Sequence, residues 1–131
     1  MLKTMKSTQI KLESAADGLL MMSESDYPFT WFETPVDQLD EKLILQLAGK
    51  PEGSVIEKTD LDHLLRNMTS TSSGTVNQET AKKFSSLSSG IKEELTDVVV
   101  YRVGEVRIEV LIAGITKEGK VAGMRTQLIE T

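Results

Sequence analysis

The final third of the chain changes from a helical to a strand-like pattern, and this change limits the possible folds more than any other feature. Residues 98–102 and 106–112 alternate or run apolar in the manner of strands, and Val103-Gly104-Glu105 permits a tight reversal between them. Lys117-Glu118-Gly119-Lys120 forms the next turn, after which residues 121–129 read as the last strand. The pattern predicts a meander of three antiparallel strands.

Helical periodicity dominates the chain before this meander. Apolar residues spaced by three or four positions predict helices over residues 4–16, 37–49, a short segment from 59 or 60 to 68, and 78–95. The proposed N-caps of the last three helices are Asp37, Thr59 or Asp60, and Asn77. Ser88-Ser89-Gly90 lowers helix propensity in the middle of the last helix.

Two further short strands are expected at residues 29–33 and 55–58. Strands early and late in the chain, with helices gathered between them, favour helices that cover a mainly antiparallel sheet, an α+β sandwich. The length of 131 residues fits one domain over residues 1–131, without a linker or an internal repeat.

Composition and charge exclude several classes of partner and location. The net charge is −5 and the basic residues are scattered, so we expect no direct contact with nucleic acid, and a basic protein suits the surface better. The chain contains no cysteine and no apolar run of membrane-spanning length. The basic N-terminus is not followed by an apolar signal-peptide core. We expect a cytoplasmic protein that does not bind membranes.

Residues that would carry enzymatic chemistry are sparse. A nucleophile paired with histidine would depend on His63 alone, which is expected at the surface of a short helix. No histidine pair or calcium-type loop is present, and the glycines at 104, 114, 119 and 123 do not precede a helix as phosphate-binding loops do. A catalytic site of two paired carboxylates, as in glycosidases, stays an open alternative, although no pair stands out among 20 acidic residues. We expect no enzyme, no cofactor and no metal of the protein's own.

Residues 17–29 combine an apolar run, a short acidic segment and a proline between aromatic residues. Pro28 fixes its own φ and restricts the backbone of Tyr27, so the segment containing Glu24 is expected to form a fixed turn. The expected core anchors on its two sides are Met21, Met22, Tyr27 and Phe29. Two interpretations stay open at this point. Glu24 is either a rigid carboxylate that contacts a basic group or a metal ion, or part of an ordinary solvated turn.

The last strand is expected to run from Met124 almost to Thr131, without a polar tail. A strand that ends one residue before the end of the sequence would hold the hydroxyl and α-carboxylate of Thr131 at the edge of a rigid element. The alternative interpretation is an ordinary edge strand.

Two groups of motifs, one near each end of the sequence, occur in order at the spacing of a known family. The first group is Asp17-Gly18-Leu19-Leu20, Met22-Ser23-Glu24-Ser25 and Tyr27-Pro28-Phe29. The second is Tyr101-Arg102, Gly104-Glu105-Val106, the Gly119 turn, Ala122-Gly123 and Glu130-Thr131. With these motifs the chain resembles, along nearly its whole length, the nuclease A inhibitor-like family of small acidic proteins.

The resemblance implies a three-layer α/β/α sandwich with a mainly antiparallel sheet and helices on both faces. It also implies a monomeric protein that blocks the active cleft of a sugar-nonspecific nuclease of the ββα-metal type. Glu24 would approach the catalytic magnesium of the nuclease, and Thr131 would reach the same region through its hydroxyl or carboxylate, directly or through water. The expected surrounding contacts are Ser23, Ser25, Asp26, Thr75 and Glu130.

The segment 69–77 departs from the family pattern. An aromatic anchor and acidic residues are expected in this loop, and the sequence has neither. Loss of a buried aromatic anchor weakens an interface by about 2 kcal/mol or more. Two alternatives to inhibition follow: an interaction or adaptor domain of the same fold that has lost nuclease inhibition, and, with less support, a carboxylate-dependent hydrolase.

Overall fold

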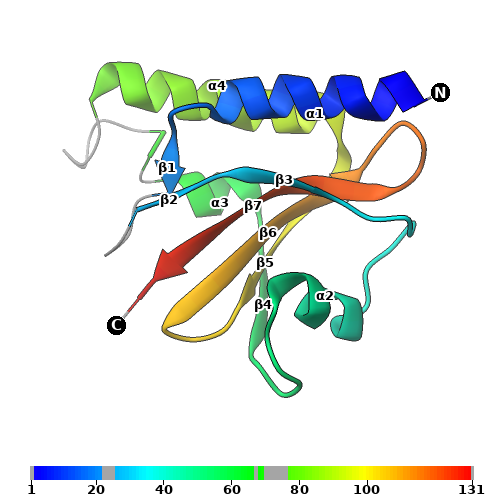
Figure 1. Cartoon of the computed structure of the whole chain (residues 1–131). Coiled ribbons are helices and arrows are strands. Elements are labelled where there is room, and N and C mark those ends of the chain that lie inside the picture. Colours follow the sequence, from blue (N-terminus) through cyan, green and yellow to red (C-terminus); the bar gives the residue numbers. More distant parts are fainter. Residues whose placement is uncertain (1, 22–25, 67, 70–76, 131) are drawn as a thin grey trace.

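The computed structural model describes residues 2–21, 26–66, 68–69 and 77–130. The helices are α1 (Leu2–Ala16), α2 (Glu41–Ala48), α3 (Leu61–Leu65) and α4 (Gln78–Glu94). The strands are β1 (Leu20–Met21), β2 (Tyr27–Pro28), β3 (Thr30–Glu33), β4 (Ile56–Thr59), β5 (Thr96–Val103), β6 (Arg107–Ile115) and β7 (Val121–Ile129). Figure 1 shows this arrangement and confirms the predicted α+β class.

Five strands form one antiparallel sheet in the order β3-β7-β6-β5-β4. The predicted meander is confirmed, because β5 pairs with β6 and β6 pairs with β7. The pairing of β6 with β7 is unbroken from Arg107 opposite Ile129 to Ile115 opposite Val121. The short strands β1 and β2 form a separate two-stranded sheet. The described sheet therefore has β3 and β4 at its edges and β6 at its centre.

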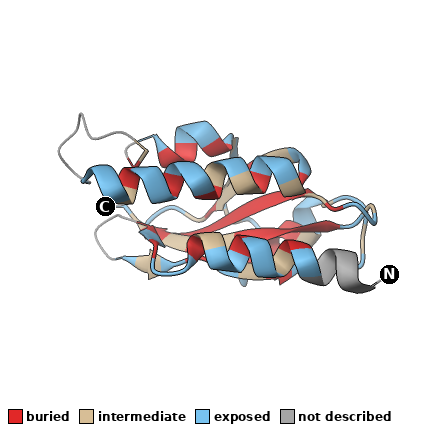
Figure 2. Ribbon diagram, turned by 90° about the horizontal axis from the view of Figure 1, so that it is seen from above, coloured by how far each residue is buried: buried red, intermediate tan, exposed pale blue. Residues whose placement is uncertain are grey.

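The sheet is covered on both faces, as predicted. Side chains from α1, α3 and α4 join one apolar cluster with one face of the sheet, and side chains from α2 join a second cluster with the other face. Strand β6 is buried along almost its whole length, so both of its faces need a cover. Figure 2 shows the buried residues along the central strands and on the inward sides of the helices.

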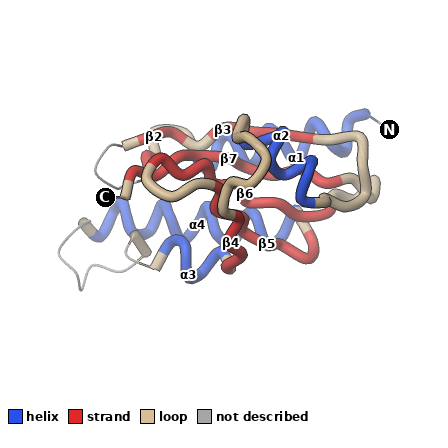
Figure 3. The backbone as a smooth tube through the Cα atoms, turned by 90° about the horizontal axis from the view of Figure 1, so that it is seen from below, coloured by secondary structure: helices blue, strands red, loops and turns tan. Residues whose placement is uncertain are grey.

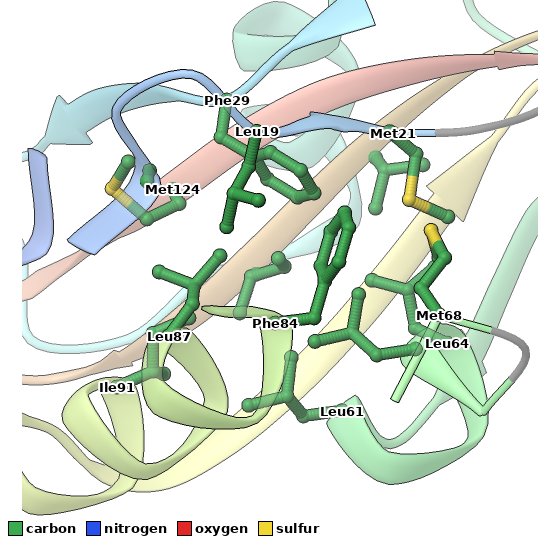
Figure 4. Packing of buried hydrophobic residues seen from close by; sticks show 14 of the residues in the cluster. Leu19, Met21, Phe29, Leu61, Leu64, Met68, Phe84, Leu87, Ile91 and Met124 are labelled. Carbon is green, nitrogen blue, oxygen red and sulfur yellow. The ribbon is translucent and has the colours of Figure 1, made fainter. Parts of the chain in front are cut away.

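The larger cluster is centred on Phe84 of α4, which is fully buried. The ring of Phe84 meets that of Phe29 edge to face, with a distance of 6.1 Å between the ring centroids. Figure 4 shows side chains from β1, α3 and α4 converging around these rings. The predicted buried face of α4 is confirmed and consists of Ala81, Phe84, Leu87 and Ile91, followed by the capping residue Leu95.

The start of α2 was wrongly predicted. Its N-cap is Asp40, whose carboxylate accepts a hydrogen bond of 2.8 Å from the backbone N–H of Leu43, and not Asp37. The chain after β3 stays attached to the sheet, because the N–H of Val121 donates to the carbonyl of Val36. A helix cannot begin until the chain has left this contact. The shift changes the buried face, which consists of Ile44, Leu45 and Ala48.

The other two predicted N-caps are confirmed. Asp60 accepts a hydrogen bond from the N–H of His63 at the start of α3, and Asn77 accepts one from Thr80 at the start of α4. Gly49 ends α2 in the left-handed conformation expected of a C-terminal glycine. Helix α4 continues through Ser88-Ser89-Gly90 without a break, because its apolar face packs on α1 and the sheet.

Gly90 and Gly123 provide opposite tests of this packing. A methyl group at Gly90 would lie 3.6 Å from the side chain of Leu12, an ordinary contact, so Gly90→Ala should raise the free energy of unfolding by about 1 kcal/mol. A methyl group at Gly123 would overlap the carbonyl oxygen of Ile112, so Gly123→Ala should lower the free energy of unfolding by about 3 kcal/mol or more. Urea unfolding of the two variants measures both effects, and a destabilised Gly90→Ala variant would contradict the packing of α1 on α4.

Candidate functional site

Strands β1 and β2 bring the chain back on itself around the predicted Glu24 turn. Met21 lies opposite Tyr27, and Leu20 lies opposite Pro28. Met21 and Phe29 are buried in the larger apolar cluster, which confirms them as core anchors. Tyr27 is half-buried and is not among the residues of either described cluster. Asp26 is described and exposed. Outside the described residues lie Met22, Ser23, Glu24 and Ser25.

This hairpin is attached to the C-terminal half of β7. The hydroxyl of Thr126 donates a hydrogen bond of 3.3 Å to the carbonyl oxygen of Tyr27. Just beyond β2, Thr30 of β3 lies opposite Arg125 of β7, so β2 and β3 follow one edge of the same strand. Because β3 and β7 are antiparallel, the Tyr27 end of the hairpin lies toward the C-terminal end of β7. Thr126 was not recognised from the sequence, where it reads as an ordinary strand residue.

The last described residue is fixed by main-chain and side-chain contacts. Strand β7 ends at Ile129, as predicted, and the N–H of Glu130 donates a hydrogen bond of 2.9 Å to the carbonyl of Val106. The carboxylate of Glu130 accepts from Arg102 at 2.6 Å, and Arg102 also forms an ion pair of 3.4 Å with Glu57 of β4. Arg102 therefore joins β4 to the end of β7. Thr131 lies outside the described residues.

Arg102 changes the interpretation of Glu130 as a free acidic contact. The Arg102 side chain is only 19% exposed and the Glu130 side chain is 50% exposed, so Glu130 is both reachable and oriented by a neighbouring cation. Such partly exposed pairs contribute about 0–1 kcal/mol to stability, and their main effect is on geometry. The sequence motif Tyr101-Arg102 singled out Arg102, but it did not indicate that Arg102 pairs with Glu130.

The described residues on either side of the segment 70–76 lie at the same end of the molecule as the hairpin. Met68 is buried in the apolar cluster that contains Met21, and Asn77 caps α4. Figures 1 and 3 show the start of α4, the start of β2 and the end of β7 at one end of the molecule. We call this end, marked by Tyr27, Asn77 and Glu130, the hairpin end. Thr75 lies outside the described residues.

The rest of the described chain gives little support to other chemistry. His63 is exposed on α3, as predicted. In the described ranges, no three histidine, aspartate or glutamate side chains are grouped so that they could hold a metal ion. None of the helices within these ranges combines the length and apolar character needed to cross a bilayer.

Comparison with protein families identifies the class. The model of the nuclease A inhibitor-like protein family matches residues 6–131, nearly the whole chain. The protein belongs to this nuclease A inhibitor-like family, as its motifs predicted. Comparison with curated proteins gives no significant match.

Thr126→Val tests the attachment of the hairpin to β7. The substitution keeps the shape of a 4% exposed side chain and removes the hydrogen bond to the Tyr27 carbonyl, so it should cost about 1 kcal/mol of unfolding free energy. Hydrogen exchange should also accelerate at the amides of β1 and β2 more than at those of β5 and β6. An equal acceleration at all four strands would contradict a local attachment.

Proposed function

We propose that this protein binds and blocks the active cleft of a sugar-nonspecific, metal-dependent nuclease through Glu24 and the C-terminal Thr131. The membership of the nuclease A inhibitor-like family supports the nuclease as the partner class. The observation that carries the site is the convergence of the start of β2 and the end of β7, the described elements closest in sequence to the two proposed oxygen ligands, at the hairpin end.

Covalent geometry adds to this support. Glu24 is two residues from Asp26 in the sequence and Thr131 follows Glu130 directly, and consecutive Cα atoms are about 3.8 Å apart. The edge formed by β2 and β3 follows β7 toward its C-terminus. These short lengths of chain support the proposal that both ligands act at the same end of the sheet.

The chemistry of the two residues fits the proposed target. Magnesium is a hard cation that takes carboxylate and hydroxyl oxygens and keeps several of its waters. A cleft that binds phosphates is also rich in positive charge, which an acidic protein with a net charge of −5 complements. The carboxylates of Glu24 and Thr131 would therefore occupy positions otherwise taken by phosphate oxygens, without a metal or a catalytic step of the inhibitor's own.

The surrounding contacts would come from the same end of the molecule. Asp26 and Glu130 are exposed carboxylates there, and Leu20 and Pro28 are exposed opposite each other on the hairpin. The other proposed contacts are Ser23, Ser25 and Thr75, which lie outside the described residues. We propose that a single domain, acting as a monomer, presents all of them.

A second candidate function follows from the composition of residues 69–77. This segment lacks the aromatic anchor expected at an inhibitory edge, which favours an adaptor domain that has lost nuclease inhibition. Affinity capture from native lysate distinguishes the two functions. Recovery of a ββα-metal nuclease as the main partner supports inhibition, and its absence among the captured proteins supports the adaptor.

The inhibitory site is tested by Glu24→Gln and by deletion of Thr131, each titrated into a purified ββα-metal nuclease. Glu24→Gln removes one negative charge from the proposed metal-facing pair, and deletion of Thr131 removes its hydroxyl and moves the terminal carboxylate back to Glu130. Each change should therefore weaken inhibition by about tenfold to a hundredfold, about 1.4 to 2.7 kcal/mol. Residual nuclease activity and calorimetric affinity measure the effect. Glu118→Gln, in the exposed turn between β6 and β7 at the other end of the sheet, is the matched control.

Two results would contradict this proposal, the first its site and the second its function. Wild-type affinity in both Glu24→Gln and the Thr131 deletion would remove the site assignment and leave the partner class intact. A wild-type protein that forms no complex with any nuclease of this type would remove the function itself.

The association rate should depend strongly on salt. The acidic protein and a basic cleft attract each other over about 10 Å at 0.1 M salt, and this attraction is screened at higher ionic strength. Raising NaCl from 50 to 500 mM should slow association by about tenfold and change dissociation much less. Stopped-flow mixing with the nuclease measures both rates, and a salt effect confined to dissociation would contradict electrostatic steering.

A further inference from the structure

A cavity of about 290 Å³ lies far from the hairpin end, on the face of the sheet that α2 covers in part. It is located where β6 ends and β7 begins, whereas the hairpin end lies at the C-terminus of β7. The residues that line it are Asp37, Gln38, Leu39, Asp97, Val99, Tyr101, Ala113, Gly114, Ile115 and Val121.

The cavity exists because α2 is too short to cover its face of the sheet. A helix of eight residues is about 12 Å long, whereas a strand of nine residues such as β6 extends about 30 Å. The buried side of α2 shares its apolar cluster with Phe32, Val103 and Leu111. The other end of this face is bordered instead by the segment 37–39 and the first residues of β5.

The cavity has an apolar floor and an acidic rim. Ala113 and Val121 are buried, and Leu39, Ile115 and Tyr101 are partly buried against the same cluster. The two rim carboxylates, Asp37 and Asp97, are exposed. Neither forms an ion pair with a lysine or arginine in the described part of the chain. This combination is complementary to a group with an apolar body and a cationic head.

Asp97 has an unusual backbone that places it at the rim. The register between β5 and β6 shifts between Thr96 and Val99, which marks a bulge, and Asp97 has a φ of 52°. Bulges redirect side chains that would otherwise follow the alternation of a strand. Asparagine, like aspartate, tolerates this left-handed conformation, so the charge of Asp97 can be removed without changing the backbone requirement.

We propose that this cavity binds one arginine side chain of a partner protein. The aliphatic stem would cover the apolar floor, the planar guanidinium would pair with Asp37 and Asp97, and the Tyr101 ring would contact the cation. The volume is at the lower limit of the usual range for small-molecule pockets, about 300–1,000 Å³, which favours a single long side chain. Lysine fits less well because its compact ammonium is strongly hydrated and cannot pair in a planar, bidentate manner.

This site does not depend on nuclease inhibition. The cavity and the hairpin end lie at opposite ends of β7, so one molecule has room for a partner at each. The rim carboxylates also lie away from Glu130 and Tyr27, and substitutions at the rim should leave nuclease binding unchanged.

Methyl-labelled protein titrated with N-acetyl-arginine amide tests the proposal by NMR. The methyl signals of Ala113, Ile115 and Val121 should shift in a saturable manner. N-acetyl-citrulline amide, which has the same shape without the charge, should bind at least tenfold more weakly. The double variant Asp37→Asn/Asp97→Asn should also lose at least tenfold in affinity for the arginine derivative. The control Glu52→Gln/Glu118→Gln removes the same amount of charge from residues outside the cavity lining and should bind as wild type does.

A second titration, with a peptide, tests whether the cavity accepts an arginine side chain that is part of a polypeptide. An Ala-Ala-Arg-Ala-Ala peptide should bind at least as tightly as the free derivative and shift the same methyl groups. Binding of the free derivative without the peptide would mean a site for small organic cations and would overturn the proposal. Equal affinity for the arginine and citrulline derivatives, or an unchanged affinity in a folded Asp37→Asn/Asp97→Asn variant, would overturn it as well. Backbone spectra of that variant that match wild type outside residues 34–40 and 95–101 establish that it is folded.

Discussion

The burial of β6 on both faces is the constraint on which the rest of the structure depends. Its residues from Ile108 to Gly114 are all buried, and an antiparallel strand of this kind is stable in water only if each face is covered by other elements. Helices α1, α3 and α4 cover one face and α2 covers the other. The three layers are therefore a consequence of one apolar strand at the centre of the sheet, and Gly123 on β7 permits a close approach to it.

The unbroken pairing of β6 with β7 also separates two parts of the surface. At one end of β7, the hairpin formed by β1 and β2 is held by Thr126, and Glu130 is held by Val106 and Arg102. At its other end, the short helix α2 leaves the apolar floor of the cavity uncovered. A rigid strand of nine residues is about 30 Å long, so a partner bound at one end need not contact the other.

Most of the fold was predictable because local patterns and long-range packing agree. The alternation in β5 to β7 and the spacing of Ala81, Phe84 and Leu87 are strong signals. The three-stranded meander and helix α4 both formed as predicted. The start of α2 was not predictable from Asp37, because a hydrogen bond between Val36 and Val121 delays the helix, and these residues are distant in sequence. At the hairpin end, the sequence indicated a turn and the last strand, but not the pairing of β1 with β2 or the contacts of Thr126 and Arg102. The alternation of a strand assigns a face to each side chain and does not identify its partner across the sheet.

The contacts of Glu130 bear on how the end of β7 could take part in the proposed interface. The end of a chain is ordinarily mobile, and a partner that binds it must offset the free energy of ordering it. Here the N–H of Glu130 is bonded to Val106, and its carboxylate is held by an arginine that also contacts β4. This arrangement fixes the sheet as far as Glu130. An ion pair that adds little to folding stability can therefore matter for affinity, because it reduces the entropy lost when the partner binds.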